Sequence, residues 1–195
     1  MIEDEIKIPE SQKNETPLFI WETIKVVLIS LAIILPIRYY LIQPFFVKGA
    51  SMELNFKNGD YLLVDEISYR FRPAQRGEVI VFRYPYDTTQ FFIKRIIGLP
   101  GETIEIRGNS VNIYNRDYPK GLVLNEKYLS SFQKTLGDEV LKLKDDEYFV
   151  MGDNRLQSSD SRRWGPLEKK FITGRTLIRL WPLNRITVIP EIKYN

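Results

Sequence analysis

The stretch EVIVFRYPYDTTQFFIKRIIGLPG, residues 78–101, gives the strongest indication of the fold. Its first part, 78–84, contains the run Val79-Ile80-Val81-Phe82, whose apolar side chains would cover both faces of a central strand. A second apolar run, 91–98, ends at Leu99-Pro100-Gly101, which is a turn signal. We therefore expect two strands within these residues.

Short runs of the same kind continue on both sides of this stretch. Strands are also expected at 61–64, 103–107, 111–114, 139–142, 148–151, 172–180 and 186–189. Gly108-Asn109 predicts a hairpin between two of them, and Asp145-Asp146 predicts another, between 139–142 and 148–151. No ten-residue amphipathic helix is evident after Val47, so residues 44–195 are expected to be mainly β.

The composition excludes several kinds of active site. The chain has 195 residues, a net charge of +3, and neither cysteine nor histidine. Without cysteine there are no disulfides, thiol nucleophiles or thiolate metal sites. Without histidine the usual general base, the usual zinc ligand and every Ser-His-Asp arrangement are absent. A hydrolase with this composition needs Lys, Asp, Glu or a backbone amine as its base, and the small net charge does not indicate a nucleic-acid partner.

The N-terminal region differs from the rest of the chain. Residues 1–20 are polar and acidic, which predicts a disordered tail. Residues 26–37 carry no charge, but twelve helical residues rise only about 18 Å, so a membrane span requires Lys25 and Arg38 to reach opposite interfaces. A cleaved signal peptide and a buried core helix are the alternatives. We favour one uncleaved span over 21–43, whose orientation the evenly distributed flanking charges do not decide.

Two segments contain candidate reactive side chains. Ser51 lies in Gly49-Ala50-Ser51-Met52, soon after the apolar stretch, where a serine is more commonly a turn or cap residue than a nucleophile. Lys94 lies within the apolar run 91–97, where burial would lower the pKa of its amine and make it a usable base. The alternative for Lys94 is an edge strand whose lysine reaches water.

A third segment, GDNRLQSSDSRRWG at 152–165, is dense in Asp, Asn, Ser and Arg. Such a composition fits a solvated loop. It also fits a loop held rigid by Asx and Ser hydrogen bonds and by paired Asp and Arg side chains. In a rigid loop, a serine hydroxyl could orient a neutral lysine amine. Composition alone does not choose between these two interpretations.

In order and content these segments resemble the bacterial type I signal peptidases, the membrane-anchored Ser-Lys proteases that remove signal peptides from exported proteins. The matching motifs are Gly49-x-Ser51-Met52, Gly59-Asp60, Arg76-Gly77-Glu78-Val79, Lys94-Arg95 through Pro100-Gly101, and residues 152–165. The resemblance implies an antiparallel β-sheet protease domain over 44–195 and one transmembrane helix over 21–43. It also implies a cytoplasmic tail at 1–20 and a catalytic domain on the extracytoplasmic side of the plasma membrane.

The resemblance also implies roles for individual residues. Ser51 would be the nucleophile, Lys94 the general base, and the Ser51 N–H an oxyanion donor. Ser158 would hydrogen-bond the lysine amine, with Asp160–Arg162 and Arg95–Asp153 as supporting ion pairs. Shallow pockets for small substrate side chains would be lined by Val47, Met52, Phe56, Phe92 and Ile93. The implied partners are signal peptides and the lipid bilayer, with no nucleic acid, metal or organic cofactor.

One position departs from the family pattern. Leu54 stands where the family usually has proline, which would pre-order the segment behind the nucleophile. We expect the departure to leave that segment less constrained and to tune rate or substrate choice. It could instead mark a degenerate, membrane-tethered β-domain that binds exported chains without cutting them. A self-cleaving repressor of related fold is a further alternative, but the chain has no basic helix-turn-helix pattern.

Overall fold

The computed structural model describes residues 16–36, 42–192 and 194. The chain divides into two compact units, Met1–Tyr39 and Tyr40–Asn195. Most of the predicted tail, 1–15, lies outside the described residues, and so do residues 37–41 of the predicted span. Each unit is therefore described by itself.

The first unit contains one helix, α1 (Thr16–Pro36), among its described residues. It begins five positions before residue 21, where the predicted span starts, so residues 16–20 are helical and the prediction of a disordered tail is wrong for them. Among the described residues, no helix combines the length and the apolar character that crossing a membrane requires. At the other end of the predicted span, Ile42 and Gln43 belong to a strand instead, because they pair antiparallel with Asp65 and Val64.

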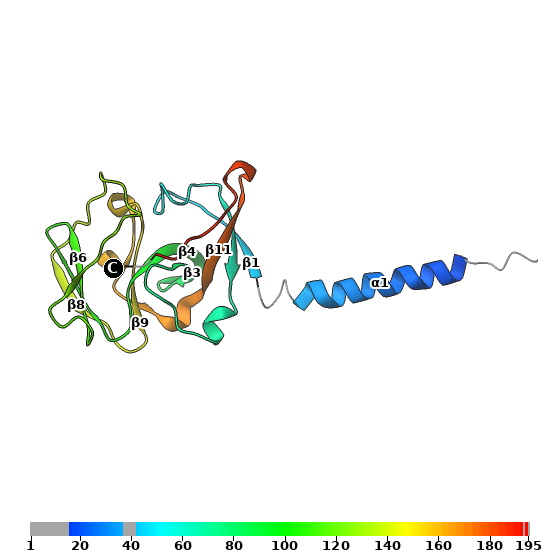
Figure 1. Ribbon diagram of the computed structural model, residues 1–195, viewed down its shortest axis with the longest axis horizontal. Coiled ribbons are helices and arrows are strands. Elements are labelled where there is room, and N and C mark those ends of the chain that lie inside the picture. Colours follow the sequence, from blue (N-terminus) through cyan, green and yellow to red (C-terminus); the bar gives the residue numbers. More distant parts are fainter. Residues whose placement is uncertain (1–15, 37–41, 193, 195) are drawn as a thin grey trace, which may run out of the picture. The chain divides into compact units, whose positions relative to one another are not determined.

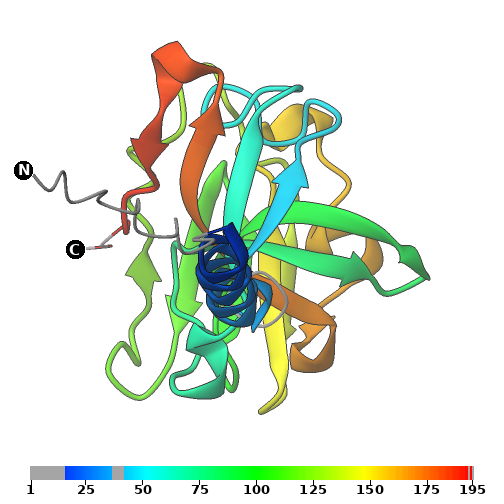
Figure 2. The same cartoon turned by 90° about the vertical axis from the view of Figure 1, so that its right-hand side faces the viewer.

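The second unit is mainly antiparallel β-structure, as the sequence predicted (Figures 1 and 2). The strands of its larger sheet are β1 (Ile42–Phe46), β2 (Tyr61–Asp65), β3 (Val79–Tyr84), β4 (Asp87–Gly98), β9 (Glu147–Met151), β10 (Leu167–Glu168), β11 (Ile172–Trp181) and β12 (Thr187–Val188). Their order is β1-β2-β11-β3-β4-β9-β10, with β12 paired to β11. The β3–β4 hairpin, in green, projects from the rest of the unit (Figure 2).

A smaller sheet contains β5 (Thr103–Arg107), β6 (Ser110–Tyr114), β7 (Leu122–Val123) and β8 (Glu139–Lys142), in the order β7-β6-β5-β8. The predicted hairpin at Gly108-Asn109 is confirmed, since β5 pairs with β6. The hairpin predicted at Asp145-Asp146 is wrong. β8 pairs with β5 in the smaller sheet, whereas β9 pairs with β4 and β10 in the larger one, so this turn carries the chain between the two sheets.

Helices in the second unit are short. They are the 3₁₀ turns η2 (Ser68–Arg70), η3 (Arg155–Gln157), η4 (Lys169–Phe171) and η5 (Leu183–Arg185), and the α-helix α2 (Ser161–Trp164). The absence of a long amphipathic helix therefore matches the expectation for the described residues after Val47.

Strand β3 is buried along the apolar run that predicted it. Val79, Ile80, Val81 and Phe82 are all inaccessible to solvent or nearly so, because β3 lies between β11 and β4 within the sheet. In the β3–β4 pairing Ile80 lies opposite Lys94, and Val79 lies opposite Arg95. The register thus places two consecutive basic residues of β4 in the interior of the unit.

The backbone at Leu54 has a conformation that proline could not adopt. Leu54 has φ +84°, in the left-handed region that a bulky L-residue rarely occupies, and its side chain is 56% exposed. Proline requires φ near −65°, so it cannot adopt this conformation. Position 54 therefore differs from the family pattern in backbone conformation as well as in side chain.

We predict that Leu54→Gly raises the free energy of unfolding by about 1 kcal/mol, because glycine adopts positive φ without steric cost. Leu54→Pro should lower it by more than about 1 kcal/mol, because its ring imposes the wrong φ. Thermal unfolding of the purified variants measures both effects. Leu54→Ala is the control, since it removes the side chain and keeps the strain. A proline variant as stable as the parent chain would contradict the assigned backbone.

Candidate active site

Ser51 lies in a compact turn that follows β1. Within it the Glu53 N–H donates to the Ala50 carbonyl at 3.0 Å, and the Phe56 N–H donates to the Met52 carbonyl at 2.8 Å. The side chains of Met52 and Phe56 are only 1% and 2% exposed, and they pack in the core with other apolar residues of the larger sheet. The turn is thus anchored by its own apolar side chains, leaving Ser51 beside a groove.

Lys94 meets Ser51 from strand β4. Its Nζ atom lies 2.8 Å from Ser51 Oγ and also donates to the Ile93 carbonyl at 2.8 Å. The residue is 3% exposed, and the amine sits 5.2 Å from the centre of the Phe92 ring. Burial lowers the pKa of Lys94 from 10.5 to about 8, while the carboxylates of Asp160 and Asp153 act in the opposite direction. A useful fraction of the amine is therefore neutral near physiological pH.

Asp160 organises the polar loop at 152–165. Its carboxylate accepts hydrogen bonds from Arg162 Nε at 2.9 Å, from Arg162 Nη2 at 2.8 Å and from the Gly152 N–H at 3.0 Å. Burial alone would raise the pKa of Asp160, but Arg162, the nearby Ser158 hydroxyl and the Gly152 N–H together outweigh it and hold that pKa below its usual value. The loop is accordingly rigid at this point, not solvated.

Arg95 and Asp153 form a second buried ion pair. The Arg95 guanidinium donates to Asp153 at 2.8 Å and 2.6 Å, and to the Gly77 carbonyl at 2.7 Å. Asp153 also accepts from Asn55 Nδ2 at 2.7 Å. Because Arg95 follows Lys94 on β4, this pair joins the strand of the lysine to the loop and to the turn of Ser51.

Ser158 is placed near these groups, but without the bond that was expected. Its side chain is buried, 4% exposed, and its Oγ lies near the Asp160 carboxylate, whose pKa it lowers, without the geometry of a regular hydrogen bond to any described residue. The hydrogen bonds of the Lys94 amine go to Ser51 and Ile93 instead. Gly152 lies closely packed between Ser158 and Ser51. A side chain at this position would overlap Ser158 Oγ and the Ser51 carbonyl, so only glycine fits there.

Asn154 links the polar loop to the serine turn, a contact that the sequence did not predict. Its backbone N–H donates to the Ser51 carbonyl and its Nδ2 donates to the Ala50 carbonyl, each at 3.0 Å. Both bonds fix the serine turn against the polar loop. The dense polar composition of 152–165 was the available signal, but it did not distinguish which of its side chains would reach the turn.

The groove beside Ser51 and Lys94 has a volume of about 670 Å³. Residues 45–51 line one side and residues 90–94 the other, with Leu62 and Val81 also contributing. Of the five expected pocket residues, Val47, Phe92 and Ile93 line the groove. Met52 and Phe56 do not, because they are the core residues that anchor the turn.

The strands on the two sides of the groove have free edges. Among the described residues, β1 pairs only with β2, and residues 87–93 of β4 pair only with β3. Apart from groups such as the Ile93 carbonyl, which accepts from Lys94, backbone N–H and C=O groups along these edges face no partner strand in the described part of the chain. The site thus combines a buried lysine amine, a serine hydroxyl and a groove between two strands with unpaired edges.

Comparison with known proteins identifies the family. The model of the family "Signal peptidase, peptidase S26" matches residues 20–181. Probable signal peptidase I-1 of Synechocystis sp. is 38% identical over 175 residues, covering 86% of this chain and 85% of that protein. Signal peptidase I of Leptolyngbya laminosa is 37% identical over 185 residues, covering 89% and 85%.

A solved structure is also similar. The crystal structure of a signal peptidase I from Enterococcus faecalis V583 is 32% identical to this chain, with a TM-score of 0.45, over 53% of this chain and 97% of that one. The family model and the sequence relatives cover most of the chain, including the residues of the candidate site. The chain therefore belongs to the signal peptidase family, peptidase S26.

Proposed function

We propose that this serine endopeptidase of the signal peptidase family cleaves the signal peptides of exported preproteins with Ser51 as nucleophile and Lys94 as general base. The observation that carries the proposal is the 2.8 Å contact between Lys94 Nζ and Ser51 Oγ, made by an amine that is almost fully buried. No histidine exists in the chain to serve as the base instead.

The reaction follows from this pair. Ser51 Oγ attacks the scissile carbonyl while the neutral Lys94 amine accepts its proton, and the tetrahedral intermediate collapses to an acyl-enzyme. The resulting ammonium donates a proton to the leaving amine. The neutral amine then takes a proton from a water molecule, which attacks the ester; as the ester breaks, Lys94 returns that proton to Ser51 Oγ and the signal peptide leaves with a free carboxyl group.

The oxyanion of each intermediate requires a preorganised donor, worth on the order of 3 kcal/mol in hydrolases. We assign this role to the backbone N–H of Ser51, which donates no hydrogen bond to other described residues. Gly49, two positions earlier, has no side chain that could contribute a second donor.

The polar loop residues are proposed to support the pair. Asp160 with Arg162, and Asp153 with Arg95, hold the loop and the strand in register through their buried ion pairs. Ser158 is proposed to hydrogen-bond the ammonium that Lys94 becomes after it accepts the serine proton, because its buried hydroxyl lies near Asp160 but makes no regular hydrogen bond in the described part of the chain.

The groove indicates what the substrate presents. An extended peptide between β1 and β4 would place alternate side chains against Val47, Ile93 and Phe92. These apolar side chains leave room next to Ser51 for small residues and disfavour large ones. We therefore propose substrates with small side chains close to the cleaved bond.

We also propose that the N-terminal unit anchors the chain in the plasma membrane as a single span, with residues 1–20 in the cytoplasm and the protease unit outside. Along α1 the apolar residues of 24–35 are exposed on every side of the helix. Lipid contact would remove this apolar surface from water. Such an anchor would also hold the groove near the membrane, where signal peptides lie.

Replacing either member of the pair tests the mechanism. Ser51→Ala and Lys94→Met should each lower the rate of signal-peptide cleavage at least about 10⁴-fold, because each removes a group that forms or breaks bonds. Ser110→Ala is the matched control, since Ser110 lies in β6 of the smaller sheet, away from the groove, and should be dispensable. Substantial turnover by either dyad variant, with the parent chain active, would exclude that residue from the proposed role.

The pH dependence of cleavage should report the Lys94 amine. Because the base must be neutral, kcat/KM should rise with pH through about 8, the pKa of Lys94, and level off above it. At pH 7 the rate should be about one tenth of the plateau, since one pH unit changes the neutral fraction about tenfold. A rate that keeps rising through pH 10, or that is flat from pH 6 upward, would argue for a different base.

Charges placed in α1 test the membrane anchor. The full chain should remain in the membrane fraction after alkaline carbonate extraction, whereas Leu28→Arg combined with Leu31→Arg should release it. Each central arginine costs about 2.5–3.5 kcal/mol for insertion. Thr23→Arg, near the polar end of the helix, is the control. Equal retention of the double variant and the parent would show that α1 is not the anchor.

A further inference from the structure

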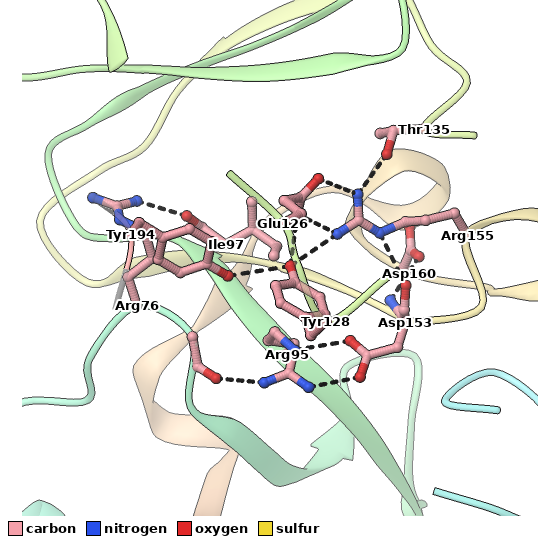
Figure 3. A network of polar contacts seen from close by, with 12 residues as sticks. Arg76, Arg95, Ile97, Glu126, Tyr128, Thr135, Asp153, Arg155, Asp160 and Tyr194 are labelled. Atoms are coloured by element: carbon pink, nitrogen blue, oxygen red, sulfur yellow. Dashed lines mark hydrogen bonds and ion pairs between the residues drawn. The ribbon is translucent and has the colours of Figure 1, made fainter. Parts of the chain in front are cut away.

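Tyr128 lies in a loop of the smaller sheet, and it contacts residues that hold the active-site segments together, Arg95 and Asn55. It lies between β7 and β8 and belongs to none of the motifs that identified the candidate site. Its ring faces Arg95 and its hydroxyl meets Arg155 (Figure 3), while its carbonyl accepts a hydrogen bond from Asn55.

The ring of Tyr128 covers the guanidinium of Arg95. The guanidinium carbon lies 4.1 Å from the ring centre, within the range of a cation–π interaction. Arg95 is next to Lys94 on β4, and its guanidinium is the group that holds Asp153. The ring therefore packs on the ion pair that joins the lysine strand to the polar loop.

The carbonyl of Tyr128 reaches the serine turn. It accepts a hydrogen bond at 3.1 Å from Asn55 Nδ2, and the same amide nitrogen donates to Asp153 at 2.7 Å. Asn55 is four residues after Ser51. One side-chain amide is thus held between the smaller sheet's loop and the polar loop, and it restrains the turn that carries the nucleophile.

The hydroxyl of Tyr128 is part of a buried polar network. It donates to Glu126 at 2.6 Å and accepts from Arg155 Nη2 and from the Tyr194 hydroxyl, each at 3.1 Å. Arg155 belongs to the polar loop, and Tyr194 lies near the C-terminus. These bonds hold the tyrosine in place, but none of them touches Lys94 or Ser51.

We propose that Tyr128 is a positioning residue for the Ser51–Lys94 pair, acting through its ring on Arg95 and through its carbonyl on Asn55. The inference rests on the proposed function. The serine and the lysine come from segments 43 residues apart, so their separation depends on the groups that hold the two segments together. Small displacements of such groups lower the rate of the chemical step without weakening substrate binding.

Three variants of the full chain test this role in a signal-peptide cleavage assay. Tyr128→Leu should lower kcat at least about tenfold with KM within about twofold of the parent, because the cover on Arg95 is lost. Tyr128→Phe should keep kcat within about threefold, since the ring and the carbonyl remain. Tyr114→Leu is the matched control from the same sheet: its hydroxyl donates to Glu105, and its loss should leave kcat unchanged.

A fourth variant covers the case in which Tyr128→Leu does not fold. Asn55→Ala removes the amide between the Tyr128 carbonyl and Asp153, and it should reproduce the fall in kcat at unchanged KM. An unchanged kcat in Tyr128→Leu or Asn55→Ala, or an equal fall in Tyr114→Leu, would overturn the proposal. The same assay includes the parent chain and Ser51→Ala. If the parent is active and Ser51→Ala is inactive, the proposed function holds, and a negative result with the Tyr128 variants then counts only against the positioning role.

Discussion

The burial of one amine is the constraint on which the rest of the site depends. Lys94 is removed from water in the interior of the larger sheet, and desolvation is the largest effect on its pKa. Two carboxylates lie near enough to oppose that effect. Each is engaged by an arginine, Asp160 by Arg162 and Asp153 by Arg95. The two carboxylates still favour the protonated lysine, but burial outweighs them and keeps the pKa of Lys94 low.

The same ion pairs also have a mechanical consequence. The serine turn, the lysine strand and the polar loop come from distant parts of the sequence, and side-chain bonds join them together with the backbone bond from Asn154 to Ser51 and the pairing of β4 with β9. Asn154 ties the loop to the turn from one side, and Asn55 does so from the other. Tyr128, in a loop of the smaller sheet, contacts Arg95 on the lysine strand and Asn55 in the serine turn. Residues of both sheets therefore hold Ser51 and Lys94 in place.

Local patterns predicted the strands well and their partners less well. The apolar run at 79–82 becomes the buried strand β3, and the family resemblance of the motifs is confirmed by the matched relatives. The turn at Asp145-Asp146 is real, but a turn signal does not reveal whether the next strand returns to the same sheet. Met52 and Phe56 were expected in a pocket and lie in the core, because an apolar residue type fits both environments. The roles of the site residues and the membrane span stay predictions.

The most direct test is a titration of the Lys94 side chain itself. In an NMR experiment with isotope-labelled lysine, the Lys94 signal can be assigned by its loss in Lys94→Met and followed with pH in the full chain. The account predicts a midpoint near 8, well below that of the exposed lysines. A midpoint above 10 would mean that the amine is cationic wherever the enzyme works, and it would contradict the assignment of Lys94 as the base.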